Sequence, residues 1–107
     1  MTVINKTPHP VHIIDENGQV IRTYEVGDSI ISPTITIIQD IPLSDGTPTS
    51  KTIFGNPEEL PEFIEGVFYI VPQLVKYSEP NRTDLLVPAE IVRDKTGNII
   101  GCKSLGR

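Results

Sequence analysis

The stretch VHIIDENGQVIRTY, residues 11–24, decides the fold. Its two ends are rich in β-branched residues, which are enriched in strands. Between them lies DENG, residues 15–18, and an aspartate at the first turn position followed by Asn-Gly favours a type I turn. The glycine of such a turn takes the left-handed conformation and forms a bulge. This stretch therefore predicts a β-hairpin.

A second hairpin of the same kind is predicted near the other end of the sequence. Residues 91–93 lead into DKTG, residues 94–97, and residues 98–102 lead out. Aligned on Asp15 and Asp94, the two segments share the pattern D-x-x-G-x-[VI]-I. The turn chemistry alone accounts for this likeness, and an internal duplication is the alternative.

A third pair of strands is predicted between these two hairpins. Residues 34–37 alternate polar and apolar side chains with the period of a half-buried strand. Asp45-Gly46 then marks a turn, and residues 49–54 are the predicted return strand. Three nearby prolines lack the amide donor of a ladder, so we expect this pair at a sheet edge or with irregular ends: Pro33, Pro42 and Pro48.

Two apolar runs complete the predicted strands. VFYIV, residues 67–71, is continuous and rich in β-branched and aromatic residues, which predicts the central strand. Residues 85–87 predict another strand, which we expect to stop at Pro88.

The helical content is expected to be small. NPEE, residues 56–59, has the signature of a helix start, and Pro61 limits it to a single turn. Residues 73–78 predict a second short helix. With about seven short strands and no segment long enough for repeated crossover helices, we expect residues 1–107 to form one β-rich domain. We expect a compact antiparallel barrel or sandwich.

Length, charge and cysteine content limit the possible functions. A chain of 107 residues has room for one domain. The net charge of −5 argues against non-specific nucleic-acid binding, which depends on Lys and Arg at phosphates. Cys102 is the single cysteine, and no secretory leader or membrane span is evident, so we expect a cytoplasmic protein.

Taken together, several segments in order resemble a family of small proteins from phages, prophages and bacteria. The resemblance spans nearly the whole chain and rests on residues 7–9, 20–23, 66–75, 80–85 and 92–102. In those relatives a serine typically follows the Tyr-Ile-Val run, whereas this chain has Pro72, so no role of such a hydroxyl carries over. The family brings no activity with it, and the resemblance implies a phage protein or a bacterial cytoplasm.

Motifs for enzyme chemistry are missing from the sequence. There is no nucleophile elbow, no phosphate-binding glycine loop and no dinucleotide fingerprint. The two histidines, His9 and His12, are three residues apart, so in a strand they point to opposite faces. With Cys102 they lack the usual ligand spacing, and we expect no metal and no cofactor.

A few polar residues are candidates for holding a ligand. His9 lies between two prolines that present it on a stiff, extended segment. A polar loop offers the forked donors of an arginine together with hydroxyl and amide groups, and it comprises Asn81, Arg82, Thr83 and Asp84. The alternative for this loop is that Arg82 and Asp84 simply pair with each other or with the backbone.

Two further arginines and a tyrosine complete the candidate set. Arg22 and Arg93 lie beside the two predicted turns, where they face solvent or line one pocket if the hairpins pack side by side. Tyr69 offers a ring for stacking and a hydroxyl, although a tyrosine in a central strand is more often part of the core. Cys102 has the character of a small buried apolar residue.

The sequence favours a non-enzymatic binding protein over an enzyme. In its concrete form this hypothesis is a phage anti-defence protein, a homo-oligomer that sequesters an anionic nucleotide immune signal. One alternative is an inhibitor or accessory that presents an edge strand to a partner protein. The other is a small nucleotide hydrolase or lyase with His9 as base and Arg82 and Arg93 as anion clamps.

Overall fold

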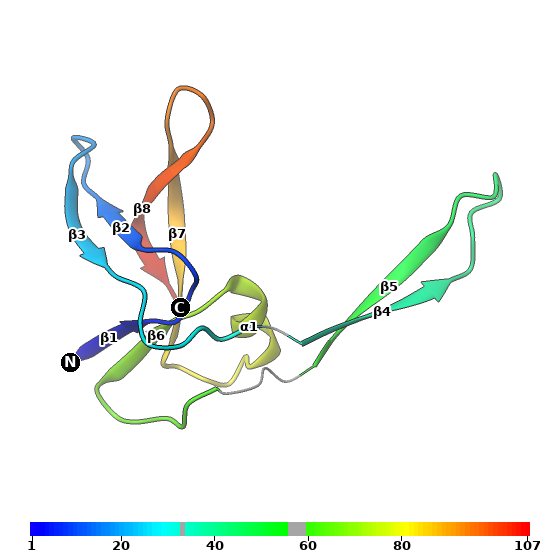
Figure 1. Cartoon of the computed structure of the whole chain (residues 1–107), viewed down its shortest axis with the longest axis horizontal. Helices are drawn as coiled ribbons and strands as arrows, with labels where there is room; N and C mark the ends of the chain where they lie inside the picture. Colours follow the sequence, from blue (N-terminus) through cyan, green and yellow to red (C-terminus); the bar gives the residue numbers. More distant parts are fainter. Residues whose placement is uncertain (33, 56–59) are drawn as a thin grey trace.

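The computed structural model describes residues 1–32, 34–55 and 60–107 and is mostly β. Within these ranges there are eight strands and one short helix (Figure 1). In chain order the elements are β1 (Thr2–Asn5), β2 (Val11–Ile14), β3 (Val20–Tyr24), β4 (Thr34–Asp40), β5 (Thr49–Gly55), β6 (Val67–Ile70), α1 (Gln73–Ser78), β7 (Leu85–Arg93) and β8 (Ile99–Gly106). The expected β-rich fold with one or two short helical turns is therefore confirmed.

Six strands form one sheet, in the order β1-β6-β7-β8-β2-β3. Just beyond β3, Val26 forms a parallel bridge with Asn5 of β1, and the Gly27 amide donates to the Asn5 carbonyl at 2.9 Å. The end of β1 therefore meets the chain just after β3, and the six strands curve into a small barrel that is closed at this one point. Its pairing is mixed rather than antiparallel throughout, because β1–β6, β6–β7 and β8–β2 are parallel.

The apolar side chains divide into two cores. All six strands contribute to the barrel interior, which contains Val3, Val11, Ile13, Tyr24, Phe68, Ile70, Leu86, Cys102 and Leu105. The second core lies outside the barrel wall, where α1 and the chain around Ile31 and Leu60 pack against β6 and β7. Alternate residues of β6 face the two cores, which explains why the run at residues 67–71 is apolar without interruption.

Both predicted Asp-x-x-Gly turns are confirmed, and they have the same structure. Gly18 and Gly97 have φ values of +80° and +90°, which glycine adopts without strain. In each turn the aspartate Oδ1 accepts two backbone amides, from residues two and four positions later. The two hairpins lie next to each other in the sheet because β8 pairs with β2.

The strand predicted to stop at Pro88 continues to Arg93, so that prediction was wrong. Pro88 is paired with Leu105 of β8 within β7. On the other side of β7 the pairing with β6 ends at Leu86, so beyond that point no neighbour on this side requires an amide donor. The strand also bends here, since Glu90 has a φ of +53°.

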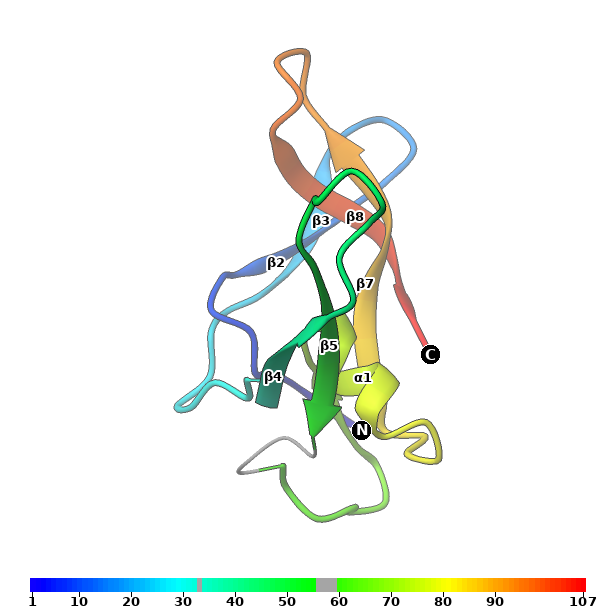
Figure 2. The same ribbon diagram turned by 90° about the vertical axis from the view of Figure 1, so that its right-hand side faces the viewer.

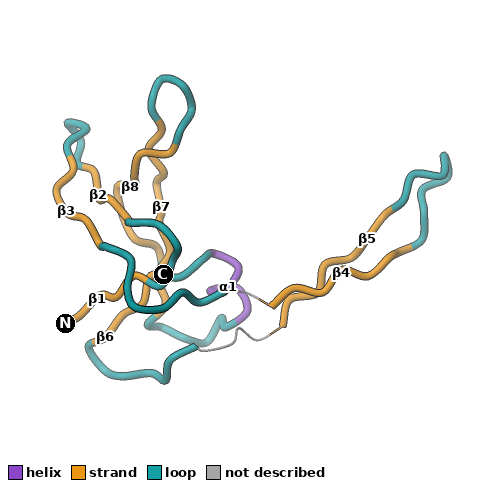
Figure 3. The backbone as a smooth tube through the Cα atoms, in the orientation of Figure 1, coloured by secondary structure: helices purple, strands orange, loops and turns teal. Residues whose placement is uncertain are grey.

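The predicted third pair is confirmed as β4 and β5, but it does not join the barrel. These strands form a two-stranded antiparallel sheet, seven residues long on each side. Figures 1 and 3 show this hairpin, residues 34–55, reaching away from the barrel, with α1 near its base; we call it the arm. Figure 2 turns the molecule by 90° so that the arm lies in front of the barrel.

The arm makes the molecule elongated. Its extents are 51 × 39 × 22 Å and its radius of gyration is 16.9 Å, whereas a compact chain of this length has about 13 Å. The short helix predicted at residues 73–78 is confirmed as α1. The helical turn predicted at residues 56–59 lies outside the described residues. Among those described, no helix has the length and apolar character needed to cross a membrane.

Candidate functional site

One end of the barrel opens into a groove between β1, β3 and the end of β8; we call it the barrel-mouth groove. Its two halves share Met1, Val3 and Tyr24. One half, of about 210 Å³, is also lined by Phe68, Leu86, Leu105 and Arg107. The other half, of about 330 Å³, is also lined by Thr2, Arg22 and Thr23. The mouths of β-barrels are common places for ligand sites.

Each half of the groove carries an arginine placed over an aromatic ring. The guanidinium carbon of Arg22 lies 5.2 Å from the centre of the Tyr24 ring. That of Arg107 lies 5.6 Å from the centre of the Phe68 ring. Both distances are in the range of cation–π attraction, which holds a guanidinium close to a ring without using up its hydrogen-bond donors.

The strand geometry explains one of these pairs. Arg22 and Tyr24 are two residues apart in β3, so their side chains leave the strand on the same face. Tyr24 packs into the barrel interior, while Arg22 is exposed. The groove therefore has an apolar floor that continues the barrel core, two aromatic rings, and cations at its rim.

A single buried side chain, Asn5, fixes the rim of the groove. Its amide nitrogen donates to the carbonyls of Tyr24 at 2.9 Å and His9 at 2.8 Å. Its oxygen accepts the backbone amide of Thr7 at 2.9 Å and the hydroxyl of Thr7 at 2.6 Å. All four hydrogen-bonding positions of the amide are thus used: one joins β1 to the end of β3, and three hold the segment that follows β1.

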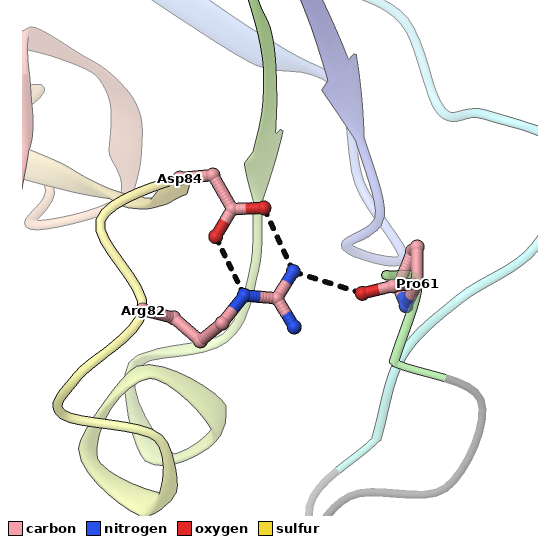
Figure 4. Close-up of polar contacts among 3 residues, drawn as sticks. All are labelled: Pro61, Arg82 and Asp84. Carbon is pink, nitrogen blue, oxygen red and sulfur yellow. Dashed lines mark hydrogen bonds and ion pairs between the residues drawn. The ribbon is translucent and has the colours of Figure 1, made fainter. Parts of the chain in front are cut away.

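Arg82 and Asp84 pair with each other, which is the alternative that the sequence left open. Arg82 Nε donates to Asp84 Oδ1 at 2.8 Å, and Nη2 donates to Oδ2 at 2.7 Å (Figure 4). The same Nη2 also donates to the carbonyl of Pro61 at 2.8 Å. This arrangement ties the loop before β7 to the chain around residue 61.

The hydrogen bonds of this pair keep the buried carboxyl ionised. Asp84 is only 1% exposed. Hydrogen bonds from Arg82, supported by the positive charge of its guanidinium, keep the pKa of the Asp84 carboxyl below its ordinary value despite burial. The same hydrogen bonds raise the pKa of Arg82. Asn81 and Thr83, on either side of Arg82, are exposed.

The other residues singled out from the sequence lie apart from the groove. Tyr69 is buried in the outer core, and its amide donates to the carbonyl of Asp84. Arg93 donates from Nη1 to the carbonyl of Gly97 within its own turn. His9 is exposed and borders a separate cavity of about 270 Å³ between the two hairpins, with His12 and mostly apolar neighbours. Of the eight predicted ligand residues, the groove contains Arg22.

Three groove residues and the buried asparagine were not singled out from the sequence: Tyr24, Phe68, Arg107 and Asn5. The spacing of Arg22 and Tyr24 in a predicted strand is a signal that could have linked those two. The pair formed by Arg107 and Phe68 spans almost forty positions and depends on how the barrel closes. No local pattern carries that information.

The reactivity of Cys102 and the arrangement of metal-ligating side chains limit the chemistry open to this protein. Cys102 is 1% exposed, and burial raises the pKa of its thiol, so little of the reactive thiolate forms. Within the part of the chain that the structure describes, there is no group of three or more His, Cys, Asp or Glu side chains arranged to hold a metal ion.

Comparisons with known proteins add no relative. No protein-family model, no curated protein and no solved structure matches this chain.

Proposed function

We propose that this protein is a non-enzymatic binding protein that holds an anionic, planar small molecule of the nucleotide type in the barrel-mouth groove. The observation that supports this proposal is the pair of arginine–aromatic contacts in one groove, Arg22 over Tyr24 and Arg107 over Phe68. Arginine binds phosphate through its forked donors. Aromatic rings and arginine planes stack on nucleobases.

The dimensions and surroundings of the groove fit such a ligand. Its halves of about 210 and 330 Å³ share three lining residues and together lie within the usual range for small-molecule sites. The floor is apolar, with Val3 and Leu105, and suits the flat face of a base. The rim carries permanent positive charge that suits a phosphate, although the whole chain has a net charge of −5.

In its concrete form, the proposal is a phage anti-defence protein acting in a bacterial cytoplasm. By holding a nucleotide immune signal, the protein would keep that signal from its receptor. Sequestration requires binding without turnover, which agrees with a groove whose charged side chains are arginines. An arginine keeps its proton at physiological pH and is a poor general base.

Isothermal titration calorimetry against cyclic dinucleotides, cyclic trinucleotides and ADP-ribose derivatives tests this proposal. We expect at least one compound to bind with one ligand per groove. Replacing Arg22→Ala or Arg107→Ala should weaken binding at least tenfold, because a hydrogen bond to a charged group contributes about 1.5–3 kcal/mol. Absence of heat with every compound would refute the nucleotide form of the proposal.

Arg93→Ala is the matched control for these variants. Arg93, like Arg22, lies on a strand beside an Asp-x-x-Gly turn, but its guanidinium contacts the carbonyl of Gly97. The variant removes one positive charge of the same type from the neighbouring hairpin. We expect its affinity to stay within twofold of wild type. If Arg93→Ala weakens binding as much as Arg22→Ala, the ligand does not lie in the barrel-mouth groove.

The enzymatic alternative is tested on the same samples. After incubation with the protein, the bound compound should be recovered unchanged. A product that forms with wild type and disappears with His9→Ala would make the protein a hydrolase or lyase acting at the cavity beside His9.

The edge-strand alternative is favoured by one observation: no strand among the described residues pairs with the outer edge of β4 in the arm. A pull-down from host lysate tests this alternative.

A further inference from the structure

The arm has apolar side chains exposed on both of its faces. In β4, side chains alternate between the faces, so Ile35 and Ile37 lie on one face and Ile38 lies on the other. Ile53 of β5 pairs with Thr36 and shares the face of Ile38. These four isoleucines are 46–70% exposed, and Ile41 beyond the end of β4 is 82% exposed. These five isoleucines are therefore open to solvent in a single chain.

The arm is also short of partners along its edges. It is a two-stranded sheet, so β4 and β5 each have one edge that no strand among the described residues pairs with. An isolated two-stranded hairpin is marginally stable in water, and a third or fourth strand normally supports it. Edges that stay free are usually protected by proline or by charged side chains, especially lysine. β4, TITIIQD, has neither proline nor lysine, and its one charged residue is the terminal Asp40.

The sequence of β4 is compatible with pairing to a second copy of itself. If two β4 strands lie antiparallel with full overlap, the middle residue Ile37 faces its own counterpart across a two-fold axis. Residues at i and 74 − i then oppose each other, so Thr36 faces Ile38 and Ile35 faces Gln39. Each of these pairs stays on one face of the sheet, and the isoleucines of the two copies become neighbours.

The charges of the arm favour this arrangement. Asp40 forms an ion pair with Lys51 of the same arm, Nζ to Oδ2 at 3.6 Å. In the antiparallel pairing the two Asp40 residues lie six positions apart along the sheet, about 20 Å, well beyond the screening length of about 8 Å. A parallel pairing in register would place them side by side. The Asp40 carboxylates of two antiparallel copies therefore repel each other little, although each whole chain carries a net charge of −5.

We infer that the arm is a dimerisation element: β4 pairs antiparallel with β4 of a second copy, centred on Ile37. The result is a four-stranded sheet, β5-β4-β4-β5, in which both free β4 edges are paired. Isoleucines that are exposed in one chain pack beside those of the other. The two barrels project from opposite ends of this sheet, so each barrel-mouth groove belongs to a single chain.

A charge swap at Ile37 tests the inference. Wild type should have the mass of two chains, twice 11.8 kDa, in light scattering or sedimentation. Ile37→Lys alone and Ile37→Glu alone should each weaken dimerisation at least tenfold, because like charges face each other at the axis. Mixing the two variants should restore a dimer that contains one chain of each. Thermal unfolding of each variant checks that its barrel is intact.

Ser50→Lys is the matched control. Ser50 of β5 pairs with Gln39 of β4, so its side chain lies on the same face of the sheet as Ile37. A lysine at position 50 therefore adds the same charge to that face, but on the outer strand. In the proposed sheet the two β5 strands are three strand spacings apart, about 14 Å, so this variant should remain a dimer. The inference is overturned if the wild type stays monomeric at every concentration, in which case the β4 edge is available to a different protein. It is also overturned if the dimer persists in Ile37→Lys.

Discussion

The side-chain amide of Asn5 donates a hydrogen bond of 2.9 Å to the backbone carbonyl of Tyr24, joining the first strand of the chain to the end of the third. Asn5 is 2% exposed and also holds the chain at Thr7 and His9. The barrel closes at this point, and Tyr24 is one of the rings of the barrel-mouth groove. A buried side chain that does not itself line the groove thus holds one of the groove residues in place.

Replacing Asn5→Leu should lower the free energy of unfolding by about 2–4 kcal/mol. The leucine has nearly the same volume, but it removes the donor to the Tyr24 carbonyl and the acceptor of the Thr7 amide, at about 1–3 kcal/mol for each group that water cannot reach. The His9 carbonyl keeps a second donor, the Thr7 hydroxyl at 3.0 Å. Urea denaturation followed by circular dichroism measures the change. Asn98→Leu is the control, because Asn98 is exposed and its loss should change stability by less than about 0.5 kcal/mol. Equal losses of stability in the two variants would show that the hydrogen bonds of Asn5 do not stabilise the fold more than those of an exposed asparagine.

The hairpins could be predicted from the sequence because their information is local. The turn residues at 15–18 and 94–97 determine both the loop geometry and the pairing of the adjacent strands. The apolar run at 67–71 was also readable, since a strand with two buried faces needs no alternation. These features depend on residues that are neighbours in the chain.

The closure of the barrel and most of the candidate groove could not be predicted. β1 is four residues long and pairs with β6, more than sixty positions away, so no nearby partner marks it as a strand. Arg107 meets Phe68 only once β6, β7 and β8 are assembled. Arg82 was also predicted to bind a ligand, whereas its guanidinium donates two hydrogen bonds to the carboxylate of Asp84, two positions later. That spacing is a local signal for an ion pair within the loop.

Asp84→Asn should change how stability depends on pH. The pKa of Asp84 is below its ordinary value of 3.8 in the folded protein, so the folded state holds fewer protons than the unfolded state near that pH. The ion pair therefore stabilises the fold above about pH 4, and this contribution is lost as the pH falls through the lowered pKa. At neutral pH we expect the variant to lose about 2 kcal/mol in the free energy of unfolding.

Urea titrations at neutral pH and at about pH 3 measure this difference. Wild type should lose more stability than Asp84→Asn between the two conditions, because the variant has no charge to lose at this position. Asp28→Asn serves as the control, since Asp28 is exposed. Parallel pH curves for wild type and Asp84→Asn would contradict the assignment.

The thiol of Cys102 should be unreactive in the native protein. It is buried in the barrel interior, and burial raises its pKa above the ordinary value of 9.0. Because the thiolate is the reactive form, Ellman's reagent at about pH 8 should label it only after the chain unfolds. The labelling rate should rise with urea in step with the unfolding transition. Rapid and complete labelling without urea would show that the barrel interior is open at this residue.

Gly101→Ala should separate the two hairpins. A Cβ at this position would lie 2.7 Å from the carbonyl oxygen of His12 and 2.5 Å from the Cδ1 atom of Ile14, closer than such atoms approach. Because the oxygen belongs to the β2 backbone, the strands themselves must move, and overpacking of this kind costs about 1–3 kcal/mol. Urea denaturation should show this loss, and amide exchange should show weaker protection in β2 and β8. In Gly106→Ala the added Cβ would lie 3.4 Å from its nearest atom, the Cβ of Ala89. This variant should lower the free energy of unfolding by less than half as much as Gly101→Ala. If both variants are equally stable, the contact between β8 and β2 is looser than the structure indicates, and the two hairpins do not depend on Gly101 for their close approach.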